Sequence, residues 1–174
     1  MKNRVAAAPA PAAAPRNAPI NIQQIRARAV SEPMPTPVDT SVWGANLWRV
    51  LHIAAHLSQA RNSIPLWRKV LEALRTGLPC PDCSAHYNAW YRAHPLKYSF
   101  IPIGGKGPII HWILDLHNAV NERTGKAKWT IEQAKAEHGA PGLIEAARNI
   151  LATSLNGIIG PSAYSALDAL LRVL

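Results

Sequence analysis

The segment Leu78-Pro79-Cys80-Pro81-Asp82-Cys83-Ser84-Ala85-His86-Tyr87 contains both cysteines of the 174-residue chain. The two thiols are three positions apart, a spacing found in redox disulfides, metal sites and haem attachment sites. Haem attachment requires a histidine directly after the second cysteine, and Ser84 stands there instead. The prolines on either side of Cys80 are tolerated in the first turn of a helix. The segment therefore predicts a cysteine pair at a helix N-terminus, where unpaired N–H groups and the helix dipole favour a thiolate.

The sequence around this segment has helical periodicity and almost no alternating β pattern. Helices are expected from about residue 41 to 61, from 65 to 76, from the cysteine pair to about His94, from 109 to 123 and, as a short helix, from 130 to 138. Gly77 is expected to end the second helix as a C-cap. The prediction is an all-α fold, a four-helix bundle followed by a short fifth helix.

Three segments are expected: an arm over residues 1–40, a domain over 41–139 and a C-terminal helical extension over 140–174. The arm is basic and rich in alanine and proline, a composition that favours disorder. It is interpreted as a linker or docking arm, with a transit peptide as the alternative. In the extension, one helix is expected over about 143–158 and another after Gly160-Pro161.

The net charge of +9 is typical of proteins that bind nucleic acid or an anionic cofactor, so both are considered as partners. No nucleic-acid-binding motif accompanies this charge, so specific nucleic acid binding is not expected. Neither a secretory signal peptide nor a transmembrane span is expected, because the sequence lacks an uninterrupted apolar segment of sufficient length.

The residues alone leave three explanations for the cysteine pair. A thioredoxin-like site requires a preceding strand, which the pattern does not predict. A zinc site requires two more ligands, for which the candidates are His52, His56, His86 and His117. The third explanation is a redox disulfide that transfers electrons to a bound acceptor, most naturally a flavin.

Flat side chains suited to a planar ring system recur on two predicted helices. Trp48, His52 and His56 are spaced by four residues, and His117 and Asn121 share another face. Lysines that could meet the phosphates of such a cofactor are Lys106, Lys126 and Lys128. For Trp129, covering the cofactor and ordinary core packing are equally favoured interpretations. No role is assigned to His94, His111 and His138.

Several sequence motifs of this chain occur in the order and spacing that is typical of one protein family. The motifs are Trp43-Gly44, Trp48-Arg49-Val50-Leu51-His52, Leu78-Pro79-Cys80-Pro81-Asp82-Cys83 with His86-Tyr87, and Leu116-His117-Asn118-Ala119-Val120-Asn121 followed by Gly125-Lys126. Together they resemble the Erv/ALR family of FAD-linked sulfhydryl oxidases, with a virus-encoded member favoured. The resemblance covers about residues 42–129.

The resemblance implies a four-helix bundle that holds FAD, in a homodimer. It implies that Cys83 lies next to the flavin and that substrate attacks Cys80, which makes these two the catalytic residues. The residues that it places at the cofactor are Gly44, Trp48, His52, His56, Cys83, His117, Asn118, Val120, Asn121, Lys126 and Lys128, with no metal ligand. Ala45 replaces an arginine found in many members.

The implied reaction oxidises the dithiol of a partner protein through the Cys80–Cys83 disulfide to FAD and then to oxygen, giving hydrogen peroxide. No second cysteine pair is available as a shuttle, so substrate is expected to reach Cys80 directly. The expected location is the cytoplasm of an infected cell or the virion, with the mitochondrial intermembrane space as the alternative. The competing functional hypothesis is a non-enzymatic, zinc-stabilised or structural basic helical protein of an assembly such as a virion.

Overall fold

The computed structural model describes residues 39–58, 63–95 and 108–174. The chain separates into two units, Met1–Thr36 and Pro37–Leu174, and the described residues belong to the second. The predicted arm, apart from Asp39 and Thr40, lies outside the described residues, as do the glycine-rich loop at 104–107 and Lys106.

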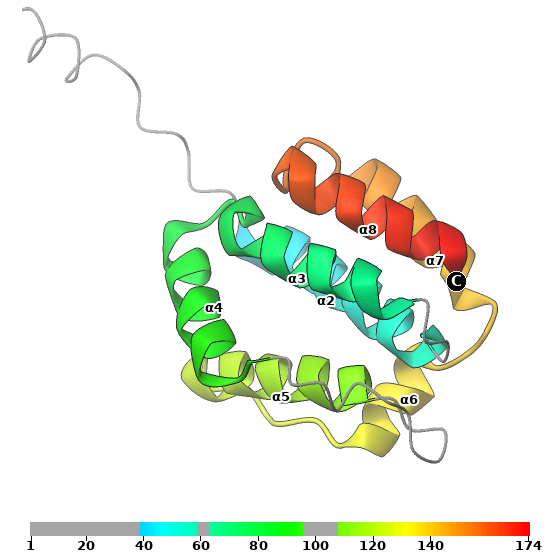
Figure 1. The fold of residues 1–174 in the computed structure, drawn as a ribbon. Coiled ribbons are helices and arrows are strands. Elements are labelled where there is room, and N and C mark those ends of the chain that lie inside the picture. The colour runs from blue at the N-terminus through cyan, green and yellow to red at the C-terminus, as the bar shows by residue number, and fades with distance from the viewer. Residues whose placement is uncertain (1–38, 59–62, 96–107) are drawn as a thin grey trace, which may run out of the picture. The chain divides into compact units, whose positions relative to one another are not determined.

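The part of the chain that the structure describes is helical and contains no strand, which confirms the all-α prediction. The helices are α2 (Thr40–Leu57), α3 (Ile64–Gly77), α4 (Pro81–Ala93), α5 (Pro108–Arg123), α6 (Ile131–His138), α7 (Leu143–Ile150) and α8 (Pro161–Val173), with a π-helical turn, η2 (Leu151–Leu155), after α7 (Figure 1).

Local signals in the sequence fix where several helices begin. The Asp39 carboxylate caps α2 by accepting a hydrogen bond from the Ser41 backbone N–H, with an oxygen-to-nitrogen distance of 2.8 Å. Thr130 and Gln133 form a reciprocal capping box at the start of α6. Proline stands in the first turn of α3, α4 and α8, where its missing N–H costs no helical hydrogen bond.

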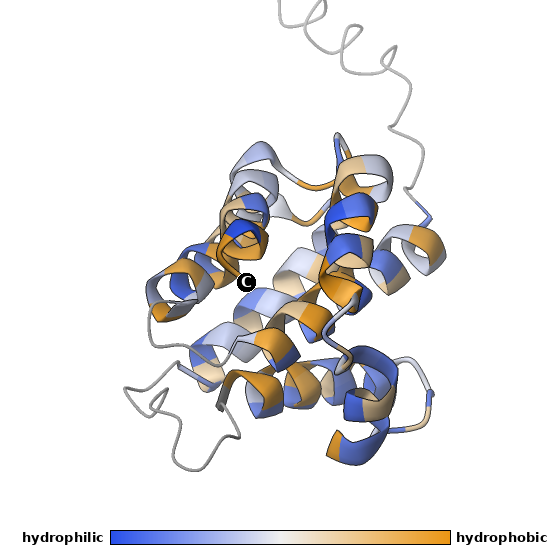
Figure 2. Ribbon diagram, turned by 90° about the vertical axis from the view of Figure 1, so that its right-hand side faces the viewer, coloured by the Kyte–Doolittle hydropathy of each residue, from blue (hydrophilic) through white to orange (hydrophobic). Residues whose placement is uncertain are grey.

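Helix α2 lies at the centre of the fold. Each residue from Val50 to His56 is buried, so the helix is enclosed around its circumference rather than along one stripe. It packs against α5, α6, α7 and η2, while α3 packs against α4 and α8. Helices α7 and α8 therefore lie along one side of α2 and α3, and α4 and α5 lie along another (Figure 1). Hydrophobic and hydrophilic residues alternate along the helices, as amphipathic packing requires (Figure 2).

The C-terminal extension differs from its prediction. A continuous helix was expected over about 143–158, but α7 ends at Ile150 and continues as the wider turn η2. Leu151 and Leu155, at the two ends of this π-helical turn, are both buried against the core. Gly157, whose φ is +73°, then reverses the chain before α8, in a conformation that favours glycine.

Gly77 is also different from its prediction, because it is not a left-handed C-cap. It is the last residue of α3, its φ is not positive, and Leu78 forms the cap in an extended conformation. Instead, the missing side chain of Gly77 allows the start of α8 to pack closely against the end of α3. The Gly160 N–H donates a hydrogen bond of 2.8 Å to the Gly77 carbonyl, and a Cβ on Gly77 would lie 2.7 Å from the Ala163 Cβ.

Gly77→Ala is therefore expected to lower the free energy of unfolding by about 1–3 kcal/mol, the usual cost of overpacking a tight contact. Gly142→Ala is the matched control, because a Cβ there meets no atom within 4 Å and its φ of −69° and ψ of −6° suit alanine. Urea unfolding followed by circular dichroism measures both. Equal stability of the two variants would contradict the packing explanation.

Candidate functional site

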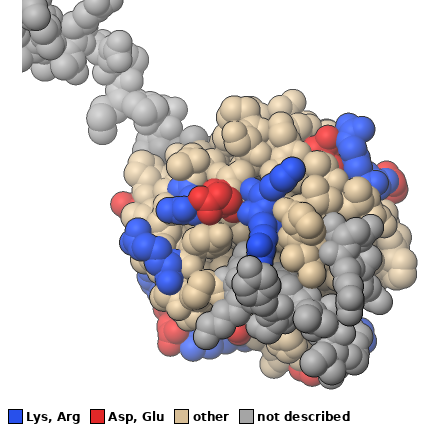
Figure 3. All heavy atoms as spheres, in the orientation of Figure 1, with Lys and Arg blue, Asp and Glu red and all other residues tan. Residues whose placement is uncertain are grey.

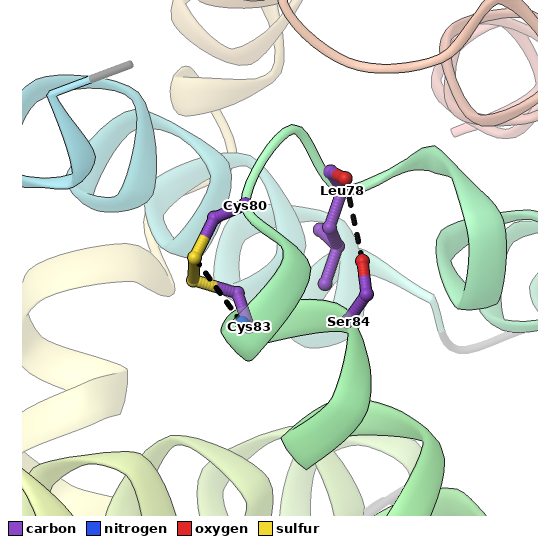
Figure 4. The surroundings of a disulfide bond; sticks show 4 residues. All are labelled: Leu78, Cys80, Cys83 and Ser84. Atoms are coloured by element: carbon purple, nitrogen blue, oxygen red, sulfur yellow. Dashed lines mark hydrogen bonds between the residues drawn. A yellow bond between two sulfur atoms is a disulfide. The ribbon is translucent and has the colours of Figure 1, made fainter. Parts of the chain in front are cut away.

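The cysteine pair forms a disulfide at the start of α4, as the sequence indicates. Cys80 is the N-cap residue, and its Sγ accepts a hydrogen bond from the Cys83 backbone N–H at 3.2 Å. Both cysteines are half-buried and pack against the hydrophobic core. Figure 4 shows the two sulfur atoms on one side of this turn, and Leu78 and Ser84 on the other. The Cys80 sulfur therefore lies where N–H dipoles stabilise a thiolate.

Hydrogen bonds between side chains and carbonyls hold α4 against α3. The Tyr87 hydroxyl donates to the Leu71 carbonyl at 2.7 Å, and the Asn88 amide donates to the Arg75 carbonyl at 2.8 Å. The Arg75 guanidinium in turn donates to the Asn88 amide oxygen at 2.9 Å. The Arg75 carbonyl lies in the last turn of α3, where carbonyls have no partner within the helix. Together these bonds fix the orientation of the helix that carries the disulfide.

Five aromatic and imidazole rings from α2, α5, α6 and the segment before α6 form one cluster. The Trp48 and His117 rings are stacked, with centroids 4.3 Å apart and an interplanar angle of 9°. His52 Nε2 and His117 Nδ1 are 2.9 Å apart, within hydrogen-bonding distance. Trp129 lies 5.7 Å from His117 and 6.4 Å from His52, measured between ring centroids. The structure thus brings together three of the predicted cofactor residues.

His138 is the member of this cluster that sequence reasoning missed. It is buried at the end of α6, and its ring stacks on His52, with centroids 5.1 Å apart and planes 13° apart. It also stacks on Trp129, at 5.8 Å and 10°. The signal in the sequence was weak, because α6 is short and a lone histidine near its end resembles a favourable partner for the helix dipole.

The cluster has hydrogen-bonding capacity that the described residues leave unused. Within the cluster, His52 Nδ1 and His138 Nδ1 are buried without a hydrogen-bond partner in the described part of the chain. Outside the cluster the same holds for His56 Nε2, Trp43 Nε1 and Trp90 Nε1. Buried polar atoms normally have partners, so unpaired ones require an explanation. Flat rings and unpaired nitrogens together fit a planar group that carries hydrogen-bonding atoms.

Burial keeps the cluster histidines uncharged. Desolvation, followed by the neighbouring His117, lowers the pKa of His52 to about 3. Desolvation, followed by His138, lowers the pKa of His117 to about 4. The pKa values of His56 and His138 are lowered as well, again mainly by burial. At neutral pH these imidazoles can therefore both donate and accept hydrogen bonds.

Two predicted cofactor residues hold the backbone of the segment before α6. The Asn118 amide nitrogen donates to the Trp129 carbonyl at 2.9 Å, and its oxygen accepts from the Trp129 N–H at 2.8 Å. The Asn121 amide donates to the Ala127 carbonyl at 3.1 Å, and the Lys126 N–H donates to the Asn121 carbonyl at 2.8 Å. The two asparagines thus hold the backbone of the segment that carries Trp129.

The other predicted residues lie around these groups. A Cβ on Gly44 would meet no atom within 4 Å, which leaves open space beside α2. Val120 is half-buried, and Lys126 and Lys128 are exposed. The Lys128 ammonium forms an exposed ion pair with Glu122 at 3.1 Å.

Among residues 39–58, 63–95 and 108–174, no group of three or more histidine, cysteine, aspartate or glutamate side chains is placed to hold a metal ion. None of the helices in these ranges is long and apolar enough to cross a membrane.

The chain belongs to the Erv1 / Alr family, whose profile matches residues 45–138, more than half of the sequence. A curated relative from Frog virus 3 (isolate Goorha), provisionally named FAD-linked sulfhydryl oxidase 088R, is 27% identical over 109 residues. These residues make up 59% of this chain and 70% of the relative. No solved structure matches. The family that the motifs resemble is confirmed.

Proposed function

We propose that this chain is an FAD-dependent sulfhydryl oxidase that forms disulfides in dithiol proteins. The observation that carries the proposal is the disulfide of its two cysteines at the N-cap of α4, in a member of the Erv1 / Alr family. The similarity to a relative named for FAD-linked sulfhydryl oxidation supports both the cofactor and the reaction class.

The residues present fit FAD. The ring cluster offers flat surfaces and unpaired buried nitrogens to a flavin or an adenine, and the exposed lysines are available to its phosphates. The proposed cofactor-binding residues are Gly44, Trp48, His52, His56, Cys83, His117, Asn118, Val120, Asn121, Lys126 and Lys128, to which the structure adds Trp129 and His138 as candidates.

Thiol–disulfide exchange at the cysteine pair accounts for substrate oxidation. A substrate thiolate attacks Cys80 Sγ, the bond between Cys80 and Cys83 breaks, and Cys83 leaves as a thiolate. A second substrate thiolate then attacks the substrate sulfur of the mixed disulfide, and Cys80 leaves. The substrate loses two electrons and two protons, and the cysteine pair gains them. The Cys83 N–H and the helix dipole stabilise the thiolate form of Cys80, by about 0.3–1 kcal/mol for the dipole.

When bound, FAD supplies the two-electron acceptor that reoxidises the cysteine pair and transfers the electrons to oxygen, giving hydrogen peroxide. The neutral imidazoles of His52 and His117 hold hydrogen-bond donors and acceptors in fixed positions without adding charge to the site. The Trp48 ring stacks on the His117 ring, and the Trp129 ring packs against the same imidazole at a tilt of 41°.

The relative from Frog virus 3 supports a virus-encoded protein that acts in the cytoplasm of an infected cell or in the virion. The mitochondrial intermembrane space is the alternative. The homodimer implied by the resemblance stays a prediction, as does oxygen as the final acceptor.

An absorption spectrum and an oxygen electrode test the proposal. Purified protein is expected to be yellow, with absorbance near ~450 nm, and to consume oxygen when a dithiol is added. Folded protein that carries no flavin and consumes no oxygen would rule out the enzyme. Bound zinc in such a preparation would favour the alternative, a zinc-stabilised structural protein of an assembly.

Asn118 offers a test of the cofactor site that does not depend on turnover. Asn118→Ala removes both hydrogen bonds to the Trp129 backbone, so FAD affinity is expected to fall about 10-fold, the effect of roughly 1–2 kcal/mol. Flavin fluorescence measures the release of FAD. The matched control, Asn149→Ala, replaces an exposed asparagine on α7 and should leave the affinity unchanged. Equal affinities for the two variants would contradict the positioning role.

A further inference from the structure

The segment that joins α3 to the disulfide, Leu78 to Pro81, has few hydrogen-bond donors of its own. Pro79 and Pro81 have no N–H, and each restricts the residue before it to extended conformations. Leu78 and Cys80 accordingly have extended backbones, with φ and ψ of −81° and 134° at Leu78 and of −109° and 120° at Cys80. The position of Cys80 therefore depends on the contacts that other residues make with this segment.

Ser84 on α4 supplies two such contacts. Its hydroxyl donates a hydrogen bond of 3.3 Å to the Leu78 carbonyl, and its backbone N–H donates one of 2.9 Å to the Cys80 carbonyl. Figure 4 shows the hydroxyl bond on the side of the turn opposite the two sulfur atoms. A single residue of α4 thus holds the segment before the disulfide at both Leu78 and Cys80.

Ser84 is itself held in place from α3. Its carbonyl accepts a hydrogen bond of 2.9 Å from the Asn88 amide, and the same amide donates to the Arg75 carbonyl of α3 at 2.8 Å. The Arg75 guanidinium donates to the Asn88 amide oxygen at 2.9 Å. A continuous set of hydrogen bonds therefore runs from α3 through Asn88 and Ser84 to Leu78.

The surroundings of the Cys80 sulfur favour a thiolate through N–H dipoles. The sulfur accepts a hydrogen bond of 3.2 Å from the Cys83 N–H, whereas the charged residue of the first turn is Asp82, whose carboxylate opposes a thiolate. Burial, followed by Arg123 of α5, lowers the pKa of His86, so this imidazole is neutral at pH 7. On the face seen in Figure 3, the described lysine and arginine side chains are interspersed with aspartate and glutamate. A thiolate on Cys80 therefore depends on its contact with the Cys83 N–H.

We propose that Ser84 is a positioning residue for the disulfide. Its hydroxyl holds the segment before Cys80, so that the Cys80 sulfur stays within hydrogen-bonding distance of the Cys83 N–H after the disulfide opens. This role rests on the proposed function, in which Cys80 is the leaving group of the second exchange step. In that step a substrate thiolate attacks the substrate sulfur of the mixed disulfide, the bond from this sulfur to Cys80 breaks, and Cys80 leaves with the bonding electron pair. A stabilised thiolate leaves faster, so the Ser84 hydroxyl speeds the release of the oxidised substrate.

Alkylation of Cys80 in full-length Cys83→Ser protein tests the proposal, because Cys80 is then the single thiol and the N–H of position 83 is retained. The rate of reaction with iodoacetamide is followed by mass spectrometry from about pH 5 to about pH 10; its midpoint reports the thiolate and its plateau reports access. Adding Ser84→Ala is expected to raise the midpoint by about 0.5 pH unit or more, which lowers the rate below the midpoint ~3-fold. Adding Ser84→Thr instead, which keeps a hydroxyl, should restore the midpoint to within ~0.2 unit.

The matched control adds Thr153→Ala to the same protein. The Thr153 hydroxyl donates a bond of the same kind, of 2.8 Å, to the Asn149 carbonyl of α7, so its loss should leave the midpoint unchanged. Circular dichroism should show the same helical content in every variant, because alanine suits a helix at both positions. A midpoint for Ser84→Ala equal to that of the Cys83→Ser parent would overturn the proposal.

The alkylation requires neither FAD nor turnover, so its outcome is separate from that of the proposed function. A raised midpoint for Ser84→Ala, in a chain that consumes no oxygen as the unchanged protein, would support the positioning role and remove the oxidase. An unchanged midpoint in a chain that is an active oxidase would do the reverse.

Discussion

Replacing Cys83 by serine is expected to lower dithiol-dependent oxygen consumption by ~1000-fold or more, because without the second sulfur no disulfide can form or be regenerated. Cys80 then remains as a free thiol at the helix N-terminus. After mild oxidation with a dithiol peptide, the variant should accumulate a mixed disulfide through Cys80, detected by mass spectrometry. Cys80→Ser should accumulate much less of this adduct, since the half-buried Cys83 is not the proposed point of attack.

The control for both variants is Ala85→Ser, which adds the same side chain at an exposed position of α4. It should keep turnover within about 3-fold of the unchanged protein. All three proteins should retain FAD and its absorbance. If Cys83→Ser still consumed oxygen at the original rate, the cysteine pair would not be the route for electrons, even in a flavin-loaded protein.

Acidification is expected to destabilise the fold strongly, because the folded chain keeps buried histidines neutral. The pKa of His52 is lowered to about 3 and that of His117 to about 4, from the usual 6.5. Below pH 6.5 these histidines therefore bind protons in the unfolded chain but not in the folded chain. The free energy of unfolding falls as the pH decreases from 6.5 towards 4. Between pH 6.5 and 4.5 the free energy of unfolding should fall by roughly 3–5 kcal/mol, with the half-buried His117 contributing less than His52.

Urea unfolding at a series of pH values measures this loss. His52→Gln removes one titrating ring while keeping a polar side chain, so its stability should depend less steeply on pH. His111→Gln changes an exposed histidine of α5 and should leave the steep dependence intact. A slope in His52→Gln as steep as in the unchanged protein would show that other groups cause the acid sensitivity.

Much of the fold could be predicted because local signals and long-range packing agree. The periodicity located the helices, and the prolines beside Cys80 located the start of the helix that carries the disulfide. Two features could not be predicted, because each depends on a contact between distant segments. The close contact of Gly77 with Ala163 and Gly160 depends on how α8 packs, and the π-helical turn after Ile150 lies in a segment that packs against α2.

The candidate site was predictable where a motif carried it and not elsewhere. The cysteine pair lies at the start of α4, as the spacing and the prolines indicate. His52, one of the residues spaced by four along α2, lies within hydrogen-bonding distance of His117. His138 belongs to no motif, and only the packing of α6 on α2 brings its ring onto His52. Periodicity could not reveal that Asn118 holds the Trp129 backbone, because side-chain-to-backbone bonds leave no repeating pattern.

The way in which α4 is attached to α3 has a consequence for catalysis. Tyr87 and Asn88 hold the helix well away from its first turn, so making or breaking the sulfur–sulfur bond leaves those attachments unchanged. The oxidised and reduced proteins should therefore have the same backbone, with only sulfur positions altered. A protein built in this way needs no rearrangement of its helices when the disulfide opens and closes.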